Sequence, residues 1–352
     1  MRSLPRDVYD RLFFTGVSAE VVMNPSIAPG EIQSHVARAY LGKSPKPGTT
    51  LVLGAGNVSG MGPIDSLFRL FLRNHTVLLK MNAVNGYMSE VLERGLRALI
   101  EEGFLRIVQG GPEEGSYLCD HPDIDEIHVT GSDKTYDAIV FGSDRLAPDR
   151  KARGEPLRSK PVAAELGGVG PAIVVPGRWT EREILQGAEL VATIAFDGGG
   201  FSCGAIDLVV LHEGWPQRET FLDALRSVFS RMPLRPAYYP GTYERYSTFV
   251  DSHAEVEFFG EPAEGQLPWA LIKGLDPDNS EEMCFSREPF CSVCAEMTLC
   301  ADDVESFLAR AVRFVSERVW GTLAVTLLVP ASAARDRITG PALERSIAGL
   351  RY

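Results

Sequence analysis

The sequence predicts an α/β fold, in which mostly parallel strands alternate with helices. Short, β-prone apolar runs alternate along the chain with segments of helical apolar spacing, and a glycine-rich loop follows the first clear strand. The length of 352 residues adds a third observation, since domains of about 150 residues are usual. Together these observations predict two α/β domains.

The first half of the chain begins the alternation of strand and helix. The apolar run 49–53 predicts a strand, and the helical spacing of 64–72 predicts a helix after it. Further strands are expected at 76–79, 105–108 and 124–129, with a helix over 88–100 between the first two of them. This order is typical of βαβ units, whose strands form a mostly parallel sheet.

A polar, proline-containing stretch at 148–160 predicts the boundary between two domains, 1–160 and 161–352. Beyond it, strands are expected at 173–175, 208–211 and 323–329, and a helix at 342–347. No internal repeat or low-complexity segment is visible in the sequence.

Composition narrows the classes of partner. The formal net charge of −12 argues against nucleic acid or an anionic membrane surface, because both need clustered Lys and Arg. The first residues lack the apolar stretch of a signal peptide, and no run reaches the ~18 apolar residues of a membrane span. These features predict a cytoplasmic protein without a membrane partner.

The six cysteines are too sparse for a disulfide framework, as expected in a reducing compartment. Cys291 and Cys294 form a CxxC pair with Cys284 and Cys300 on either side, which suggests a metal or redox site. No second CxxC or histidine pair accompanies them, so we predict ordinary strand packing and no metal ligands.

The glycine loop 54–60 after the first strand is similar to a Rossmann dinucleotide fingerprint, in which backbone amides at a helix N-terminus hold a pyrophosphate. Such a match is weak by itself. The usual fingerprint has an acidic residue at the end of the next strand, whereas that strand here ends in Lys80.

Cys203 stands just after the glycine run 198–200 and before an apolar segment. Glycines let a backbone approach a ligand closely, and a thiol placed there can attack a substrate carbonyl. Taken alone, the pattern favours a tight turn followed by a buried thiol, since free cysteine is among the most buried residue types. The other motifs of the chain favour the nucleophile.

Five motifs in order resemble the aldehyde dehydrogenase superfamily: an asparagine loop, a strand ending in lysine, a Gly-Ser turn, a Glu-Leu-Gly-Gly segment with a later cysteine, and a Glu-x-Phe element. The residues that carry them are Asn57, Lys80, Gly131, Ser132, Glu165, Cys203, Glu288 and Phe290. The resemblance covers about residues 45–350 and implies a Rossmann-like cofactor-binding domain plus an α/β catalytic domain of the aldehyde dehydrogenase type.

The resemblance implies oxidation of an aldehyde to a carboxylic acid through a thioester on Cys203. Asn57 and the Cys203 backbone N–H would stabilise the oxyanion, and Glu165 would activate the water that releases the acid. The cofactor would be NAD or NADP, and Ala83, where many members carry a glutamate, leaves the choice between them open. The residues implied in holding it are Lys80, Gly131, Ser132, Glu288 and Phe290.

Two alternatives stay open at this point. An acyl-CoA reductase uses the same thioester with CoA as partner, although Glu165 favours hydrolysis. A non-catalytic, cofactor-binding remnant is the other, because the chain is expected to be shortened at both ends relative to the family. The sequence predicts a small aldehyde as substrate, does not identify it, and leaves open whether the chain forms a homo-oligomer.

Overall fold

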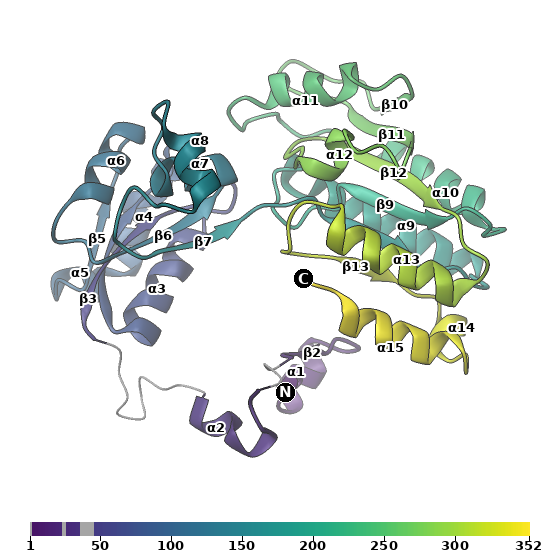
Figure 1. Ribbon diagram of the computed structural model, residues 1–352, viewed down its shortest axis with the longest axis horizontal. Helices are drawn as coiled ribbons and strands as arrows, with labels where there is room; N and C mark the ends of the chain where they lie inside the picture. The colour runs from purple at the N-terminus through teal and green to yellow at the C-terminus, as the bar shows by residue number, and fades with distance from the viewer. Residues whose placement is uncertain (1, 23–25, 36–45) are drawn as a thin grey trace.

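The computed structural model describes residues 2–22, 26–35 and 46–352, and Figure 1 shows two lobes, each built around a central sheet. Parallel strands covered by helices on both faces confirm the predicted α/β fold. The two sheets share no strand, and the chain passes once from the first sheet to the second after residue 166.

Five parallel strands form the sheet of the first lobe, in the order β5-β4-β3-β6-β7. The order reverses at β3, from which the chain extends the sheet first to one side and then to the other. Their bounds are β3 (Gly48–Leu53), β4 (His75–Lys80), β5 (Leu105–Val108), β6 (Glu126–Gly131) and β7 (Val162–Leu166). In such sheets a ligand binds at the carboxyl ends of the strands, beside the point of reversal.

Helices cover both faces of this sheet. One apolar cluster joins the sheet to α3 (Met61–Arg73), α4 (Ser89–Gly95) and α5 (Arg97–Glu101), and the other joins it to α6 (Pro112–Asp120) and α7 (Asp133–Val140). The helix expected over 88–100 is two helices, divided at Leu96 and preceded by η3 (Ala83–Met88).

The second sheet has six strands in the order β10-β11-β12-β9-β8-β13, parallel except for the antiparallel edge strand β10. Their bounds are β8 (Pro171–Val174), β9 (Leu208–His212), β10 (Val256–Phe259), β11 (Trp269–Leu275), β12 (Val293–Leu299) and β13 (Thr326–Leu328). The expected strand at 323–329 is therefore shorter than its apolar run.

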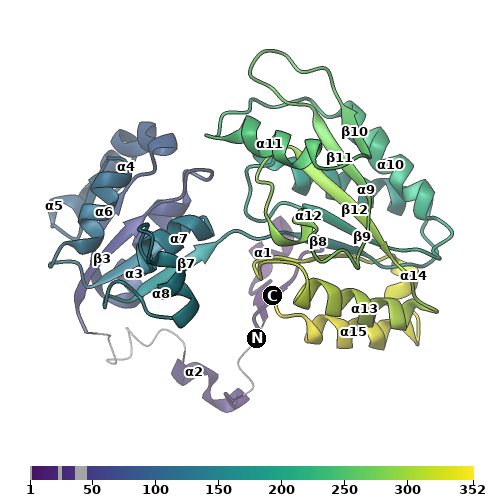
Figure 2. The ribbon, with the colours of Figure 1, turned by 45° about the horizontal axis from the view of Figure 1, so that its top comes forward.

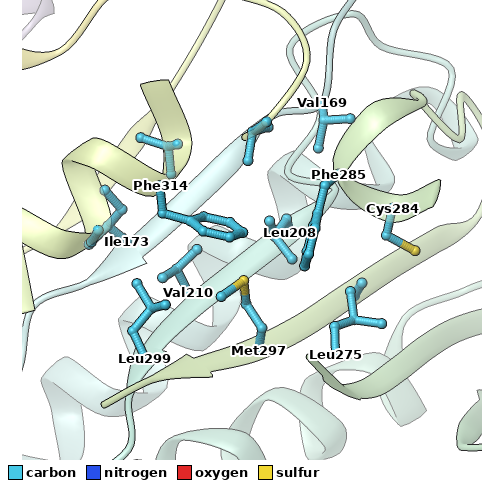
Figure 3. Packing of buried hydrophobic residues seen from close by; sticks show 14 of the residues in the cluster. Val169, Ile173, Leu208, Val210, Leu275, Cys284, Phe285, Met297, Leu299 and Phe314 are labelled. Carbon is cyan, nitrogen blue, oxygen red and sulfur yellow. The ribbon is translucent and has the colours of Figure 1, made fainter. Parts of the chain in front are cut away.

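Two cores lie on the two faces of this second sheet. One contains side chains of α9 (Glu181–Phe196) and α10 (Arg218–Arg231). The other, shown in part in Figure 3, contains side chains of α11 (Thr242–Asp251), α12 (Met283–Ser286), α13 (Val304–Glu317), α14 (Ala331–Ala334) and α15 (Thr339–Gly349). Helix α15 contains the predicted helical segment 342–347.

The domain boundary expected at 148–160, give or take several residues, stays a prediction, and the change of sheet falls several residues beyond it. This stretch contains α8 (Ala147–Arg153), and the chain then returns to the first sheet as β7, which pairs with β6. Figure 2 shows β7 extending from the first lobe toward the second. The change of sheet falls between Leu166 and Pro171, so Glu165 belongs to the first sheet and not to the second domain.

The described residues before the first lobe form short elements only. They are β1 (Arg2–Leu4), α1 (Val8–Phe13), β2 (Ala19–Glu20), η1 (Pro29–Glu31) and α2 (Ile32–His35). In the part of the chain that the structure describes, no helix has the length and apolar character needed to cross a membrane.

The CxxC pair packs as the sequence analysis predicts. Cys291 lies in the core on the α12 and α13 face of the second sheet, whereas Cys294 lies in the core on the α9 and α10 face. The two thiols are therefore on opposite faces of the sheet and do not face a common ion.

Candidate active site

The carboxyl edge of the first sheet collects several residues singled out by sequence. The loop 54–60 follows β3, Lys80 ends β4, Gly131 ends β6 and Glu165 is the penultimate residue of β7. Because the five strands are parallel, their carboxyl ends meet at one edge, where open α/β sheets bind ligands.

The second lobe contributes residues that precede two neighbouring strands. Cys203 lies between η4 (Asp197–Gly199) and β9, and Glu288 and Phe290 lie between α12 and β12. Strands β9 and β12 pair directly, so these two loops adjoin at the amino edge of the second sheet.

The glycine run before Cys203 has a steric cause. Gly198, Gly199 and Gly200 all have positive φ, and at Gly200 φ is 82°. A Cβ at Gly200 would stand 2.2 Å from the carbonyl oxygen of Cys291. Only glycine therefore allows the cysteine loop to lie against the chain that follows Phe290.

Asn57 connects the first lobe to the cysteine loop. Its Nδ2 donates a hydrogen bond of 3.0 Å to the carbonyl oxygen of Phe201, two residues before Cys203. An amide nitrogen carries two N–H groups, so the second one is left for another acceptor. The structure thus brings the predicted oxyanion donor to the loop of the predicted nucleophile, 146 residues away in sequence.

Cys203 is partly buried, and its electrostatic surroundings contain both carboxylates. Burial raises the pKa of the Cys203 thiol above its usual value, and the charges of Glu288 and Glu165 raise it further. The backbone N–H groups of Cys203 and Gly204 oppose this shift. The structure therefore gathers Asn57, Cys203, Glu165 and Glu288 at the junction of the lobes.

Glu288 is a partly buried acid of this site, with its Oε1 atom buried. Burial raises the pKa of Glu288 to about 8, Asp133 raises it further, and Arg245 opposes the rise. Its Oε1 has no hydrogen-bond partner among the described residues. The Oε2 fits against Gly167, where a Cβ would stand 2.1 Å from it. A buried acceptor without a partner is costly, so it marks a place where a ligand hydroxyl fits.

Phe290 has the unusual φ of 47° for a residue other than glycine. Its ring lies 6.0 Å from that of Phe201 and 5.0 Å from that of Tyr239, between ring centres. The guanidinium of Arg245 lies 5.9 Å from the ring centres of both Tyr239 and Phe290 and donates a 3.3 Å hydrogen bond to the Phe290 carbonyl. This aromatic group holds the Glu-x-Phe segment beside the cysteine loop.

Lys80 does not share the surroundings of Cys203. Its Nζ donates a 2.6 Å hydrogen bond to the carbonyl oxygen of Gly110, at the start of the α6 region. Burial lowers the pKa of Lys80, and the nearby Glu114 opposes that change. Lys80 therefore lies at the carboxyl edge of the first sheet, at the end of β4 and apart from Cys203.

The Gly-Ser turn leads into a helix N-terminus. Ser132 is the N-cap of α7, and its Oγ accepts a 3.2 Å hydrogen bond from the Thr135 backbone N–H. The remaining N–H groups of the first turn point outward from a helix end that favours anions. Asp133 in this turn is close enough to influence the pKa of Glu288, so α7 faces the second lobe.

Sequence reasoning missed the residues that surround the predicted ones. Gly167 was quoted only as part of a motif, yet its missing side chain makes room for Glu288. Tyr239 and Arg245 were not singled out, because nothing in their local pattern distinguishes them from surface residues. Only packing against Phe290 shows that they belong to the site.

The fold is that of a two-lobed α/β protein. Its site holds a thiol, an amide and two carboxylates between the carboxyl edge of the first sheet, which resembles a dinucleotide-binding sheet, and the second sheet. The model of the aldehyde dehydrogenase family matches residues 17–242. The chain belongs to the aldehyde dehydrogenase family, which confirms the resemblance inferred from its motifs.

Two relatives illustrate the similarity in sequence. The chain is 30% identical over 185 residues to the peroxisomal aminoaldehyde dehydrogenase 2 of Pisum sativum, covering 49% of this chain and 33% of that protein. It is 30% identical over 160 residues to an N-succinylglutamate 5-semialdehyde dehydrogenase of Sphingopyxis alaskensis, covering 44% and 30%. The chain thus spans about a third of the length of these relatives.

Solved structures show the same fold at low identity. An NAD-dependent aldehyde dehydrogenase from Sinorhizobium meliloti has a TM-score of 0.65 at 19% identity, covering 86% of this chain and 57% of that one. An NADP-dependent glyceraldehyde-3-phosphate dehydrogenase from Bacillus halodurans, complexed with NADP, also has a TM-score of 0.65 at 19% identity, covering 86% and 59%. The predicted fold type is confirmed.

Proposed function

We propose that this protein oxidises a small aldehyde to a carboxylic acid with NAD or NADP, through a thioester on Cys203. The observation that carries the proposal is the hydrogen bond from Asn57 of the first lobe to Phe201 in the loop of Cys203, together with the charges of Glu165 and Glu288 near the thiol. A thiol, an amide donor and a carboxylate are the groups that acyl transfer through a covalent intermediate needs.

The residues at the junction fit a dinucleotide. The unpartnered Oε1 of Glu288 can accept a hydrogen bond from a ribose hydroxyl, and the N-terminus of α7 after Gly131 and Ser132 suits a pyrophosphate. Lys80 would hold a ribose hydroxyl or a ribose phosphate at the end of β4, and Phe290 would flank the nicotinamide end. When bound, NAD(P)+ supplies the acceptor for the hydride of the aldehyde.

The first step belongs to Cys203. Its S–H proton passes to solvent, and its sulfur forms a bond to the aldehyde carbon while the carbonyl oxygen becomes anionic. The Asn57 Nδ2 and the Cys203 backbone N–H would donate to that oxygen, and one such donor is typically worth about 3 kcal/mol of barrier. Loss of hydride from the same carbon leaves an acyl thioester on Cys203.

The second step belongs to Glu165. Its carboxylate would take a proton from a water molecule, whose oxygen bonds to the thioester carbon as the carbon–sulfur bond breaks. The products are the carboxylic acid and the free Cys203 thiol. Glu165 is partly exposed near the carboxyl end of β7, where a water molecule can reach it.

The direct test is the Cys203→Ala variant. The assay uses a panel of aminoaldehydes and semialdehydes, which are the substrates that the relatives' names give. Each aldehyde is tested with NAD and with NADP. We expect Cys203→Ala to lower turnover by at least about 10³-fold while leaving cofactor binding intact, because a covalent nucleophile has no substitute. The exposed Cys300→Ser variant is the matched control. Full turnover without Cys203 contradicts the mechanism, and an inactive parent that binds cofactor favours a non-catalytic role.

Glu165→Gln separates the two steps. We expect an initial burst of reduced cofactor of about one equivalent per site, followed by slow release of acid, because only deacylation needs this base. Rapid-quench measurement of the burst and of the steady state distinguishes them. An unchanged steady-state rate would show that another group is the base, and faster product formation on adding CoA would identify an acyl-CoA reductase.

A further inference from the structure

A buried cluster of three potential metal ligands lies outside the site described above. It consists of His253, just after α11, together with Glu282 and Cys284 at the start of α12. One ligand atom from each residue lies within 4.8 Å of the others. The His253 Nε2 is 3.0 Å from Glu282 Oε1 and 3.8 Å from Cys284 Sγ.

The hydrogen bonds around His253 fix which nitrogen is available. Its Nδ1 lies 2.7 Å from the carbonyl oxygen of Phe249, so Nδ1 must carry the proton and donate it. In the neutral ring, Nε2 then carries a lone pair that points at the Glu282 carboxylate and the Cys284 sulfur. The Cys284 S–H can donate to Nε2, but the Nε2 lone pair and the carboxylate oxygen Glu282 Oε1, 3.0 Å apart, have no proton to share, and a cation between them would satisfy both.

The surrounding contacts have the arrangement usual around a bound metal. A histidine ligand commonly donates its other N–H to a backbone carbonyl, as His253 does to Phe249. The Glu282 Oε1 is oriented by a 2.9 Å hydrogen bond from the Cys284 backbone N–H. Figure 3 shows Cys284 at the edge of the labelled apolar cluster, beside Phe285. Apolar side chains therefore shield the cluster from water on that side.

Two of the three ligand separations are close to those of tetrahedral coordination, and the third is within 4.8 Å. Zinc binds nitrogen, oxygen and thiolate sulfur at about 2.0–2.3 Å, which places the ligand atoms roughly 3.3–3.8 Å apart. The 3.0 Å and 3.8 Å separations therefore need only small side-chain adjustments to enclose an ion. A mixed nitrogen, oxygen and sulfur set favours Zn²⁺ over Mg²⁺ or Ca²⁺, which prefer oxygen ligands.

We propose that His253, Glu282 and Cys284 bind one Zn²⁺, with a water molecule in the fourth position. On binding, the Cys284 S–H bond breaks, its proton passes to solvent and a sulfur–zinc bond forms. The ion would connect the end of α11 to the start of α12. Its ligand Cys284 lies four residues before Glu288. The ion is a structural tie beside the active-site loop and does not depend on the reaction proposed above.

The test is a titration of the chelator-treated, full-length chain with Co²⁺, followed by displacement with Zn²⁺. A Cys203→Ala, Cys300→Ser background removes the partly buried and the exposed thiols, which could bind metal themselves. We expect one Co²⁺ per chain, a thiolate-to-cobalt charge-transfer band in the near ultraviolet, and loss of this band on adding Zn²⁺.

Substitution of each ligand completes the test. We expect Cys284→Ser to abolish the charge-transfer band, and His253→Gln and Glu282→Gln to weaken binding by at least about tenfold, because changes even beyond the ligands cost 10–100-fold. His121→Gln is the matched control, since His121 pairs with an exposed Asp123 carboxylate away from the cluster. Circular dichroism checks that each variant folds. If Cys284→Ser does not fold, the His253→Gln variant still tests the proposal, because His253 is less buried than Cys284.

Two outcomes overturn the proposal. One is a chain that takes up no Co²⁺ at one equivalent, which would leave the cluster as a hydrogen-bonded contact of His253 with Glu282 and Cys284. The other is Co²⁺ binding that all three substitutions leave unchanged, which would place the ion elsewhere.

Discussion

The reactivity of Cys203 depends on two carboxylates that the fold places beside it. Glu288 and Glu165 both raise the pKa of the thiol, and Glu288 itself has a pKa of about 8. Glu288 is therefore mostly neutral at pH 7 and becomes charged as the pH rises through about 8. The charge that suppresses the thiolate thus appears in the same pH range in which the thiolate forms.

Replacing Glu288 by glutamine is expected to make Cys203 react faster at high pH. At pH 7 the difference should be small, because Glu288 is already protonated there. At pH 9 we expect about two- to fivefold faster alkylation by iodoacetamide, since the variant lacks the carboxylate charge. Mass spectrometry of the Cys203 peptide between pH 6.5 and 9.5, without cofactor, measures the rate.

Glu296→Gln is the control for this experiment. Glu296 is also a buried glutamate with a raised pKa, but it accepts a hydrogen bond from the Gly274 N–H in the second sheet. Its replacement should leave Cys203 labelling unchanged at every pH. Equal rates in the Glu288→Gln variant and the parent at pH 9 would show that the Glu288 charge does not act on the thiol.

At the scale of elements, a buried polar network joins α3 to β6. Arg69 on α3 pairs with Glu126 and donates a 2.8 Å hydrogen bond to His128 Nδ1. The other ring nitrogen of His128 therefore carries the proton and lies 3.4 Å from Asp65. Thr130 completes the network with a 2.8 Å hydrogen bond to Asp65. This contact fixes α3 against the strand that ends in the Gly-Ser turn.

Arg69→Met is expected to destabilise the first lobe by about 3 kcal/mol, because it leaves Glu126 and His128 without their donor in a largely buried place. All four tryptophans lie in the second lobe, at positions 179, 215, 269 and 320. Urea unfolding followed by circular dichroism should therefore show a transition at a lower urea concentration. The midpoint measured by tryptophan fluorescence, which reports on the second lobe, should change little.

The exposed Arg73, one turn further along α3, provides the matched control. Arg73→Met should change the free energy of unfolding by less than about 0.5 kcal/mol, as is usual for surface positions. If Arg69→Met behaves like Arg73→Met, the network contributes no stability beyond that of a surface pair.

The elements themselves were largely predictable. The strands at 49–53, 76–79 and 105–108 and the helix within 64–72 were found from apolar spacing, because burial on one face sets the local pattern. The break at Leu96 and the start of β6 at Glu126 were missed, since helix and strand ends depend on turns and pairing that a hydrophobic pattern does not record.

At the scale of the molecule, the site depends on close contact between the lobes. Tyr239 of the second lobe reaches Gly56 of the first, where a Cβ would stand 2.7 Å from the Tyr239 Oη and 2.9 Å from Asn82 Cγ. This contact is next to Asn57, whose amide bonds to the cysteine loop. The distance between the lobes therefore sets the placement of Asn57 relative to Cys203.

Gly56→Ala is expected to lower kcat/KM about tenfold, because the new methyl group displaces Tyr239 and with it the packing around Phe290, and small misplacements of reacting groups are costly. Steady-state kinetics with aldehyde and cofactor measures the effect. Adding Tyr239→Phe, which removes the clashing hydroxyl, should restore part of the activity.

Gly60→Ala is the control in the same loop, since a Cβ at Gly60 meets nothing within 4 Å. It should keep the activity of the parent. Equal activity in Gly56→Ala and Gly60→Ala would mean that the approach of Tyr239 does not position the site.

The α/β class, the order of the motifs and the family could be predicted without a structure, because local apolar spacing and short motifs are features of the chain itself. The roles of Cys203, Asn57 and Glu165 remain predictions that the kinetic tests above address. The assignment of β7 to the first sheet came from the folded structure, since strand pairing joins residues distant in sequence. It also showed that partial burial raises the pKa of Glu288 and that His253 lies beside Cys284, because burial and ligand geometry arise only when separate segments pack together.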